Sequence, residues 1–168
     1  AEIAEDERAD RLDRVRRQLS EQDITVALVY GSVHRSDDIG YLTNLCIYWN
    51  EGLLAVPADG EPTFLTKLSP RVHTWMRATS TVADLRSGRA FGPLVAGLLG
   101  DRPPGVVGLV DPGLWPGTLV DEVTEALPGW RVRPIDGLVR RQRVVVSDAE
   151  LRLLRAGARV LGAAADRA

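Results

Sequence analysis

The side chains most able to bind a metal or to act as nucleophiles are few and scattered along this sequence. The two histidines, His34 and His73, lie in different expected elements, and neither is followed by a second histidine at the i+4 spacing of a helical zinc site. Cys46 is the single cysteine, and because it stands between Leu45 and Ile47 we expect a small, buried hydrophobic residue. The sequence therefore predicts no metal site and no catalytic residue in this chain.

Two charged clusters could bind ions, but each has a simpler structural interpretation. Asp37 and Asp38 stand where acidic side chains commonly begin a helical turn, so capping is favoured over cation binding. The basic cluster of Arg140, Arg141 and Arg143 indicates a solvated face, or pairs with nearby acids, rather than an anion site. The glycines that flank the expected strands do not have the spacing of a dinucleotide loop or a phosphate loop. No cofactor is predicted for this chain.

Composition and charge narrow the class of protein. Of the 168 residues, 45% are hydrophobic and 26% are charged, which is typical of a folded globular domain. The formal net charge is −2 with acids and bases mixed, so we expect no nucleic acid partner. The apolar runs fall far short of the roughly 20 residues that a membrane helix needs, so we expect no membrane partner. An acidic start and a single cysteine predict a protein of the reducing cytoplasm.

The apolar residues recur with periods that predict alternating helices and strands. Helices are expected at 9–22, after Ser69, at 90–99, from Pro116 and from Ser147, and strands at 25–30, 53–56, 63–65, 82–85, 106–110 and 130–135. Asp59 and Gly60 predict one antiparallel hairpin between the second and third strands. The first strand is apolar throughout and is expected at the sheet centre. This order predicts an α/β fold, a three-layer domain with a mixed, mostly parallel sheet and helices on both faces.

The final helix has a clear start signal and no stop signal. Ser147 and Glu150 have the spacing of a capping box, and Leu151, Leu154 and Leu161 then share one face. The sequence ends on this helix without a glycine or proline, so we expect the natural chain to continue. Residues 1–146 are therefore expected to form one domain, and residues 147–168 to begin a linking helix.

Two segments together resemble a known family. Residues 38–44 read DIGYLTN and follow the first strand and its loop, and residues 138–156 read LVRRQRVVVSDAELRLLRA. In order and spacing they resemble the amino-terminal domain of the creatinase, prolidase and Xaa-Pro aminopeptidase family, from about Arg11 onward. Asn44 departs from the glycine common there, and three valines at 144–146 replace a frequent lysine, which leaves the subfamily open. The resemblance implies the creatinase/prolidase N-terminal fold with its ribonuclease H-like motif.

The same resemblance implies a role without chemistry for this chain. In that family a C-terminal catalytic domain, which this sequence does not contain, holds two divalent metals (Mn, Co or Zn) on two aspartates, a histidine and two glutamates. The N-terminal domain packs in a homodimer and walls the partner subunit's active site, restricting it to short peptide or small-molecule substrates. The substrate-gating candidates in this chain are Tyr48, Trp49, Asn50 and Glu51, together with His34 from the polar loop after the first strand.

Three functions stay open on the sequence alone. The leading one is the noncatalytic N-terminal domain of a metal-dependent hydrolase, an Xaa-Pro aminopeptidase or prolidase. The second is the same domain of a creatinase-type C–N hydrolase. The third is a stand-alone protein-interaction domain, because a related fold occurs in a histone chaperone subunit that has lost its metal site.

Overall fold

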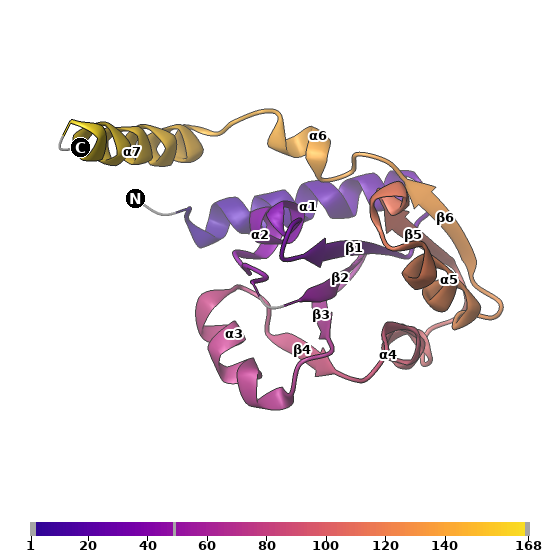
Figure 1. Cartoon of the computed structure of the whole chain (residues 1–168). Helices are drawn as coiled ribbons and strands as arrows, with labels where there is room; N and C mark the ends of the chain where they lie inside the picture. The colour runs from indigo at the N-terminus through magenta and orange to yellow at the C-terminus, as the bar shows by residue number, and fades with distance from the viewer. Residues whose placement is uncertain (1–2, 49, 167–168) are drawn as a thin grey trace.

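A mixed sheet of six strands lies at the centre of the molecule, and helices cover both of its faces (Figure 1). The computed structural model describes residues 3–48 and 50–166. The strand order is β4-β3-β2-β1-β5-β6, which places the apolar first strand in the interior of the sheet. The predicted three-layer α/β fold is therefore confirmed.

The helices and strands follow the predicted alternation. The strands are β1 (Val26–Ser32), β2 (Glu51–Pro57), β3 (Thr63–Thr66), β4 (Asp84–Ser87), β5 (Val106–Val110) and β6 (Arg131–Ile135). The helices are α1 (Glu5–Glu21), α2 (Asp37–Thr43), α3 (His73–Thr79), α4 (Phe91–Leu99), α5 (Gly117–Glu125), α6 (Arg140–Arg143) and α7 (Asp148–Ala165), with 3-10 turns η1 (Pro70–Val72) and η2 (Pro112–Leu114). β4 begins two residues later than predicted, and α6 was not predicted.

The direction of β2 makes the sheet mixed. β2 pairs antiparallel with β1, from Ser32 opposite Glu51 to Val26 opposite Pro57, and antiparallel with β3. The pairs β1–β5, β5–β6 and β3–β4 are parallel. The β2–β3 hairpin confirms the prediction from the turn sequence, where Gly60 takes the positive φ of 110° that favours glycine. The antiparallel β1–β2 pair was not predicted.

The two faces of the sheet bury separate apolar clusters. Helices α1, α2 and α3 pack on one face, and helices α4 and α5 pack on the other. Alternate side chains of β1 enter opposite clusters, Ala27 and Val29 the first and Val26 and Leu28 the second. Burial on both faces explains why this strand is apolar throughout rather than alternating with polar residues.

Cys46 is exposed, so the prediction of a buried residue at this position was wrong. The segment that follows α2 alternates its side chains between core and solvent: Leu45 and Ile47 are 0% and 1% exposed, and Cys46 between them faces outward. Leu45 and Ile47 occupy the inward positions of this segment, so Cys46 between them must point to solvent.

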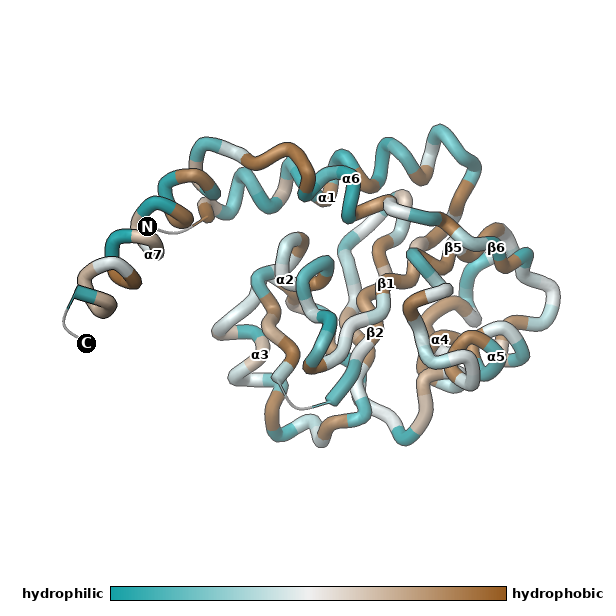
Figure 2. Tube along the Cα trace, turned by 45° about the horizontal axis from the view of Figure 1, so that its top comes forward, coloured by the Kyte–Doolittle hydropathy of each residue, from teal (hydrophilic) through white to brown (hydrophobic). Residues whose placement is uncertain are grey.

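Helix α7 extends away from the body of the domain in both views (Figures 1 and 2). It begins at the predicted capping box, in which the Ser147 hydroxyl accepts from the Glu150 amide at 3.1 Å and the Glu150 carboxylate accepts from the Ser147 amide at 2.8 Å. Beyond this start none of its described residues is buried. Leu154, Val160 and Leu161 are 62%, 70% and 72% exposed, and Figure 2 shows apolar and polar residues interleaved along the helix.

An ionic cluster around Arg11 fixes the start of α7 to the domain. The Arg11 guanidinium donates to Glu7 at 2.6 Å and to the carbonyl of Tyr41 at 2.9 Å, and it pairs with Glu150 at 3.1 Å. The Ser147 hydroxyl also donates to Glu7 at 2.8 Å. Burial raises the pKa of Glu7, but the hydrogen bonds from Ser147 and Arg11 outweigh it and hold that pKa below its ordinary 4.5. Helices α1, α2 and α7 therefore meet at one buried cation.

Candidate functional site

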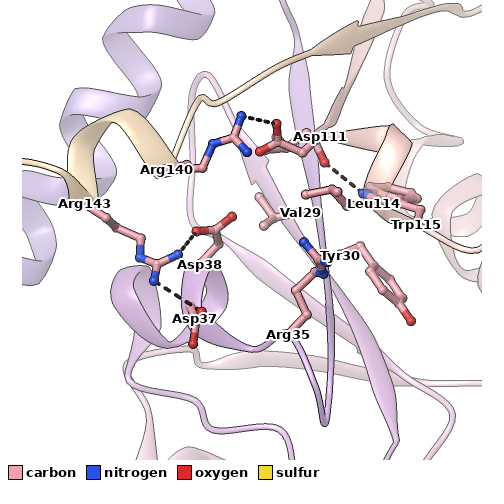
Figure 3. Close-up of a pocket in the computed structure, with 11 residues that line it drawn as sticks. Val29, Tyr30, Arg35, Asp37, Asp38, Asp111, Leu114, Trp115, Arg140 and Arg143 are labelled. Carbon is pink, nitrogen blue, oxygen red and sulfur yellow. Dashed lines mark hydrogen bonds and ion pairs between the residues drawn. The ribbon is translucent and has the colours of Figure 1, made fainter.

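A cavity of about 210 Å³ opens at the carboxyl ends of β1 and β5 (Figure 3). After β1 the chain continues toward β2 on one side, and after β5 it continues toward β6 on the other. A crevice between two parallel strands whose connections diverge is the usual ligand position in open α/β sheets. The lining residues are Val29, Tyr30, Arg35, Asp37, Asp38, Val110, Asp111, Leu114, Trp115, Arg140 and Arg143.

Arg143 closes one side of the cavity by joining α6 to the first turn of α2. Its Nη1 contacts Asp38 at 2.7 Å and its Nη2 contacts Asp37 at 3.3 Å (Figure 3). Burial lowers the pKa of Arg143, but the hydrogen bond and charge of Asp38 outweigh burial and raise that pKa above its ordinary value. The predicted pairing of the basic cluster with acids is confirmed by Arg143 and Asp38. Helix α2 does begin at Asp37, but the N-cap residue is Ser36 and no side chain makes a capping hydrogen bond, so the predicted capping by the two aspartates was wrong.

Asp111 forms the opposite side of the cavity. It directly follows β5 with φ 48° and ψ 52°, a left-handed conformation that aspartate tolerates better than most residues. Its side chain is 9% exposed; Oδ1 accepts from the Gly137 amide at 2.8 Å and has a contact of 3.5 Å with Arg140. Oδ2 has no hydrogen bond with any residue that the structure describes, so it can accept a hydrogen bond from a ligand.

Two aromatic rings supply the apolar part of the cavity wall. The Tyr30 and Trp115 centroids are 5.7 Å apart, and the Trp115 indole donates to the carbonyl of Val110 at 2.8 Å. The Tyr30 hydroxyl donates to Glu51 at 3.0 Å, and the other oxygen of Glu51 pairs with Lys67 at 2.7 Å. Burial and the hydrogen bond to Glu51 raise the pKa of Tyr30 above its ordinary 10.0, which keeps the phenol neutral and donating.

The predicted gating residues divide into two groups. His34 and Asn50 are both exposed, and their segments are joined because the Val33 amide donates to the Asn50 carbonyl at 2.9 Å. Glu51 is half-buried and is engaged by Tyr30 and a lysine, so it connects neighbouring strands. His34, Asn50 and Glu51 thus share one edge of the sheet, close to the carboxyl end of β1.

Tyr48 belongs to a second, apolar groove. Its side chain is 63% exposed, and its ring meets that of Trp75 edge-on, with centroids 5.4 Å apart at 85°. Together with Leu68 and Val72 these rings line a groove of about 230 Å³. Trp49, the remaining gating candidate, lies outside the described residues.

The cavity residues Tyr30, Arg35, Asp111 and Trp115 were not predicted from the sequence. They come from segments as far apart in the chain as residues 30 and 115, and no local motif marks them as neighbours. These residues could have been identified as neighbours only from the strand order of the sheet. Polar residues that follow two parallel strands meet at one edge, but that inference needs the pairing of β1 with β5.

The structure also brings one histidine beside a serine, a contact that the sequence analysis did not expect. His73 Nε2 and Ser87 Oγ are 2.7 Å apart, and burial together with the charge of Arg77 lowers the pKa of His73 below its ordinary 6.5. Within the described part of the chain no carboxylate contacts His73, so the pair lacks the third member of a hydrolytic triad.

Residues 3–48 and 50–166 contain no group of three or more His, Cys, Asp or Glu side chains that could hold a metal ion. The cavity itself is lined by guanidinium and carboxylate groups beside aromatic rings. Among the described helices none is long and apolar enough to cross a membrane.

Comparisons with solved structures reveal several domains of similar shape. A crystal structure of an Xaa-Pro aminopeptidase from Streptococcus pyogenes is 20% identical, with a TM-score of 0.64, and the match covers 80% of this chain and 95% of that one. The N-terminal domain of the cytoplasmic peptidase PepQ from Mycobacterium tuberculosis H37Rv is 21% identical, with a TM-score of 0.64 and coverage of 79% and 97%. These TM-scores show a shared fold.

A longer protein aligns with more of this chain. The Xaa-Pro dipeptidase from Bacillus anthracis is 16% identical, with a TM-score of 0.75, and the match covers 95% of this chain but 42% of that one. No curated protein sequence matches significantly. The family model described as Creatinase/Prolidase N-terminal domain matches residues 11–145. Because that match spans most of the sequence, the chain belongs to the Creatinase/Prolidase N-terminal domain family.

Proposed function

We propose that this chain is the noncatalytic N-terminal domain of a metal-dependent hydrolase that acts on Xaa-Pro bonds, an aminopeptidase or a prolidase. The observation that carries the proposal is the family match over residues 11–145. Solved structures of similar fold include an Xaa-Pro aminopeptidase and an Xaa-Pro dipeptidase. One neighbour is named a cytoplasmic peptidase, and we expect the same compartment for this protein.

In this proposal the metals belong to a following catalytic domain. The described residues offer no carboxylate and histidine set for two divalent ions such as Mn, Co or Zn, so no catalytic step is assigned to them. The domain contributes shape and contacts, and the chemistry takes place beyond it.

The exposed apolar residues of helix α7 are a second observation in favour of a following catalytic domain. Leu154, Val160 and Leu161 are largely exposed, although burying an aliphatic side chain of this size gains about 1.5–3 kcal/mol. The alignment with the Xaa-Pro dipeptidase omits 5% of this chain, about eight residues, so it includes most of the 18-residue helix. That dipeptidase is more than twice the length of the aligned part. We therefore assign the exposed face of α7 to contact with the catalytic domain of the same chain.

The second part of the proposal is that the domain forms a homodimer and walls the partner subunit's active site. His34 and Asn50 present exposed polar side chains at one edge of the sheet, where the chain is held by the Val33–Asn50 hydrogen bond. Tyr48 and Trp75 line the apolar groove of about 230 Å³. Broad, rigid rings of this kind suit a short apolar substrate. Glu51 supports the wall by holding its strands together.

A substrate panel tests the enzymatic part. The full-length protein, supplied in turn with Mn, Co and Zn, is assayed on Xaa-Pro dipeptides, Xaa-Pro tripeptides and creatine. We expect turnover of Xaa-Pro bonds. Turnover of creatine alone would replace the proposal with a creatinase-type C–N hydrolase. Absence of all three activities, together with capture of a stable heterologous partner, would replace it with a protein-interaction domain.

A variant of the groove tests the wall. Tyr48→Ala in the full-length protein is expected to change the ratio of kcat/KM between dipeptide and tripeptide substrates, because the exposed ring is removed from the groove. Arg131→Ala, an exposed residue of β6, serves as the control and should leave the ratio unchanged. An unchanged ratio in Tyr48→Ala would contradict the assignment.

A further inference from the structure

We propose that the cavity between β1 and β5 binds a small zwitterion, a free α-amino acid with a mid-sized apolar side chain. This inference is independent of the catalytic domain, because every residue that carries it belongs to the described part of this chain. It follows from the balance of charge in the cavity, from the groups left with hydrogen-bonding capacity, and from the apolar wall.

The charges that line the cavity sum to zero. Three arginines face three aspartates, namely Arg35, Arg140 and Arg143 against Asp37, Asp38 and Asp111. A simple anion or cation would engage only the groups of one sign. A zwitterion brings one charge of each sign and leaves the sum unchanged. Net neutrality therefore favours a ligand that is itself neutral overall and charged at both ends.

Two guanidinium groups have donors available for a carboxylate. Arg35 makes no side-chain hydrogen bond or ion pair with another described residue, and Figure 3 shows its guanidinium beside Tyr30. Arg140 has one contact, at 3.5 Å to Asp111. Each guanidinium carries five N–H donors and can bind a carboxylate through two of them. Arg143 is different, because Asp37 and Asp38 already engage it.

The ammonium end would meet Asp111. Its carboxylate is nearly buried, yet Oδ2 has no described partner and Oδ1 has one short hydrogen bond, from the backbone amide of Gly137. A mostly buried carboxylate with few protein partners favours cationic or N–H donors, and an ammonium supplies three donors in one group. Asp38 adds a second acceptor, since one of its two oxygens is engaged by Arg143.

The apolar part of the wall and the volume of the cavity indicate which side chain the bound amino acid would carry. Val29, Val110 and Leu114 line it together with the Tyr30 and Trp115 rings, so apolar surface lies beside the charged groups. Its volume of about 210 Å³ is below the roughly 300–1,000 Å³ of pockets for drug-sized ligands. The cavity thus fits a single amino acid better than a nucleotide or a longer peptide.

Nuclear magnetic resonance titration of the 168-residue chain tests the proposal with L-valine as the probe. The reporter is the Trp115 indole N–H, which donates to the Val110 carbonyl at the cavity wall. Isovalerate lacks the ammonium of valine and isobutylamine lacks its carboxylate, so they are the matched controls. Valine is expected to shift this signal saturably, and both analogues to bind at least about tenfold more weakly, since each loses charge-assisted hydrogen bonds.

Two variants assign the two ends of the ligand. Arg35→Gln is expected to weaken valine binding at least about tenfold and to leave isobutylamine binding unchanged. Asp111→Asn is expected to weaken valine and to leave isovalerate unchanged. Asparagine tolerates the left-handed conformation, and its carbonyl can still accept from Gly137. Arg71→Gln, which removes an exposed arginine away from the cavity, is the control and should bind valine like the parent chain.

Three results would overturn the proposal. Equal binding of isovalerate and valine would make the cavity a simple anion site. Equal binding of isobutylamine would make it a cation site. Absence of any saturable shift up to the solubility of valine would show that its charged groups serve the fold alone.

Discussion

Replacing Arg11 with methionine is expected to destabilise the domain by about 3 kcal/mol. The side chain of Arg11 is 4% exposed and joins three helices through Glu7 of α1, the Tyr41 carbonyl of α2 and Glu150 of α7. Its guanidinium also lies 3.9 Å from the centroid of the Tyr41 ring. Methionine keeps much of the apolar packing of the arginine stem and removes the charge and the donors.

The magnitude follows from the burial of the groups left behind. Removing one partner of a buried ion pair costs about 3–5 kcal/mol, because the other charge is stranded. The Glu7 and Glu150 side chains are 24% and 23% exposed, so water recovers part of their solvation and the lower end of that range applies. With a urea dependence of about 1–3 kcal/mol per molar, the unfolding midpoint should fall by about 1–3 M.

Equilibrium urea unfolding, followed by far-ultraviolet circular dichroism, measures this loss. Arg17→Met is the matched control, because Arg17 is an exposed arginine of the same helix, and it should lie within about 0.5 kcal/mol of the parent chain. A loss below about 1 kcal/mol in Arg11→Met would refute the account of α1, α2 and α7 as joined by one buried cation.

Three further perturbations have outcomes set by the structure. Ser147→Ala removes the capping-box acceptor of α7, worth about 1 kcal/mol, and should speed amide exchange in the first turn of this exposed helix; unchanged exchange would contradict the role of the cap. Gly52→Ala would place a Cβ 2.2 Å from the Phe64 ring and should lower stability by about 1–3 kcal/mol in thermal melts, whereas Gly157→Ala, with open space around it, should raise stability by up to about 1 kcal/mol. The pKa of Glu7 in the folded chain is below 4.5, so the stability that its carboxylate contributes is present above pH 4.5 and is lost as the pH falls through the folded pKa. The difference in melting temperature between the parent chain and Glu7→Gln should therefore be largest near neutral pH and should shrink in acid. A difference that is constant with pH would exclude this titration.

Elements with strong local signals were predictable from the sequence. The strand at Val106–Val110 and the capping box at Ser147 appear where predicted. Both are local features: a short run of apolar, mostly β-branched residues favours a buried strand, and Ser147 and Glu150 need only their spacing of three residues to form the capping box. Asn44 stands where the resemblance led us to expect glycine. It ends α2 at φ 63°, a conformation that favours glycine, and its amide contacts Arg8 and the Thr79 carbonyl, which glycine could not do.

What the sequence did not predict depends on contacts between distant segments. The antiparallel β1–β2 pair was missed because a polar loop and α2 separate the strands, so no hairpin turn marks them. The charged residues Asp38 and Arg143 were noticed separately, but only the fold brings them within 2.7 Å across 105 positions of the chain. The prediction for Cys46 was wrong because it relied on the apolar character of its neighbours and did not consider that side chains of an extended segment point alternately to the core and to solvent.

We propose that this domain walls the active site of the other subunit, and a mixed dimer separates that arrangement from a wall within the same subunit. One full-length subunit carries Tyr48→Ala and an inactivated catalytic domain, and the other subunit is unaltered in its groove and catalytically intact. We expect the dipeptide-to-tripeptide preference of the mixed dimer to shift as in the Tyr48→Ala homodimer, because in the proposed arrangement the altered groove faces the active site of the intact subunit. A mixed dimer that keeps the preference of the unaltered protein would contradict the claim.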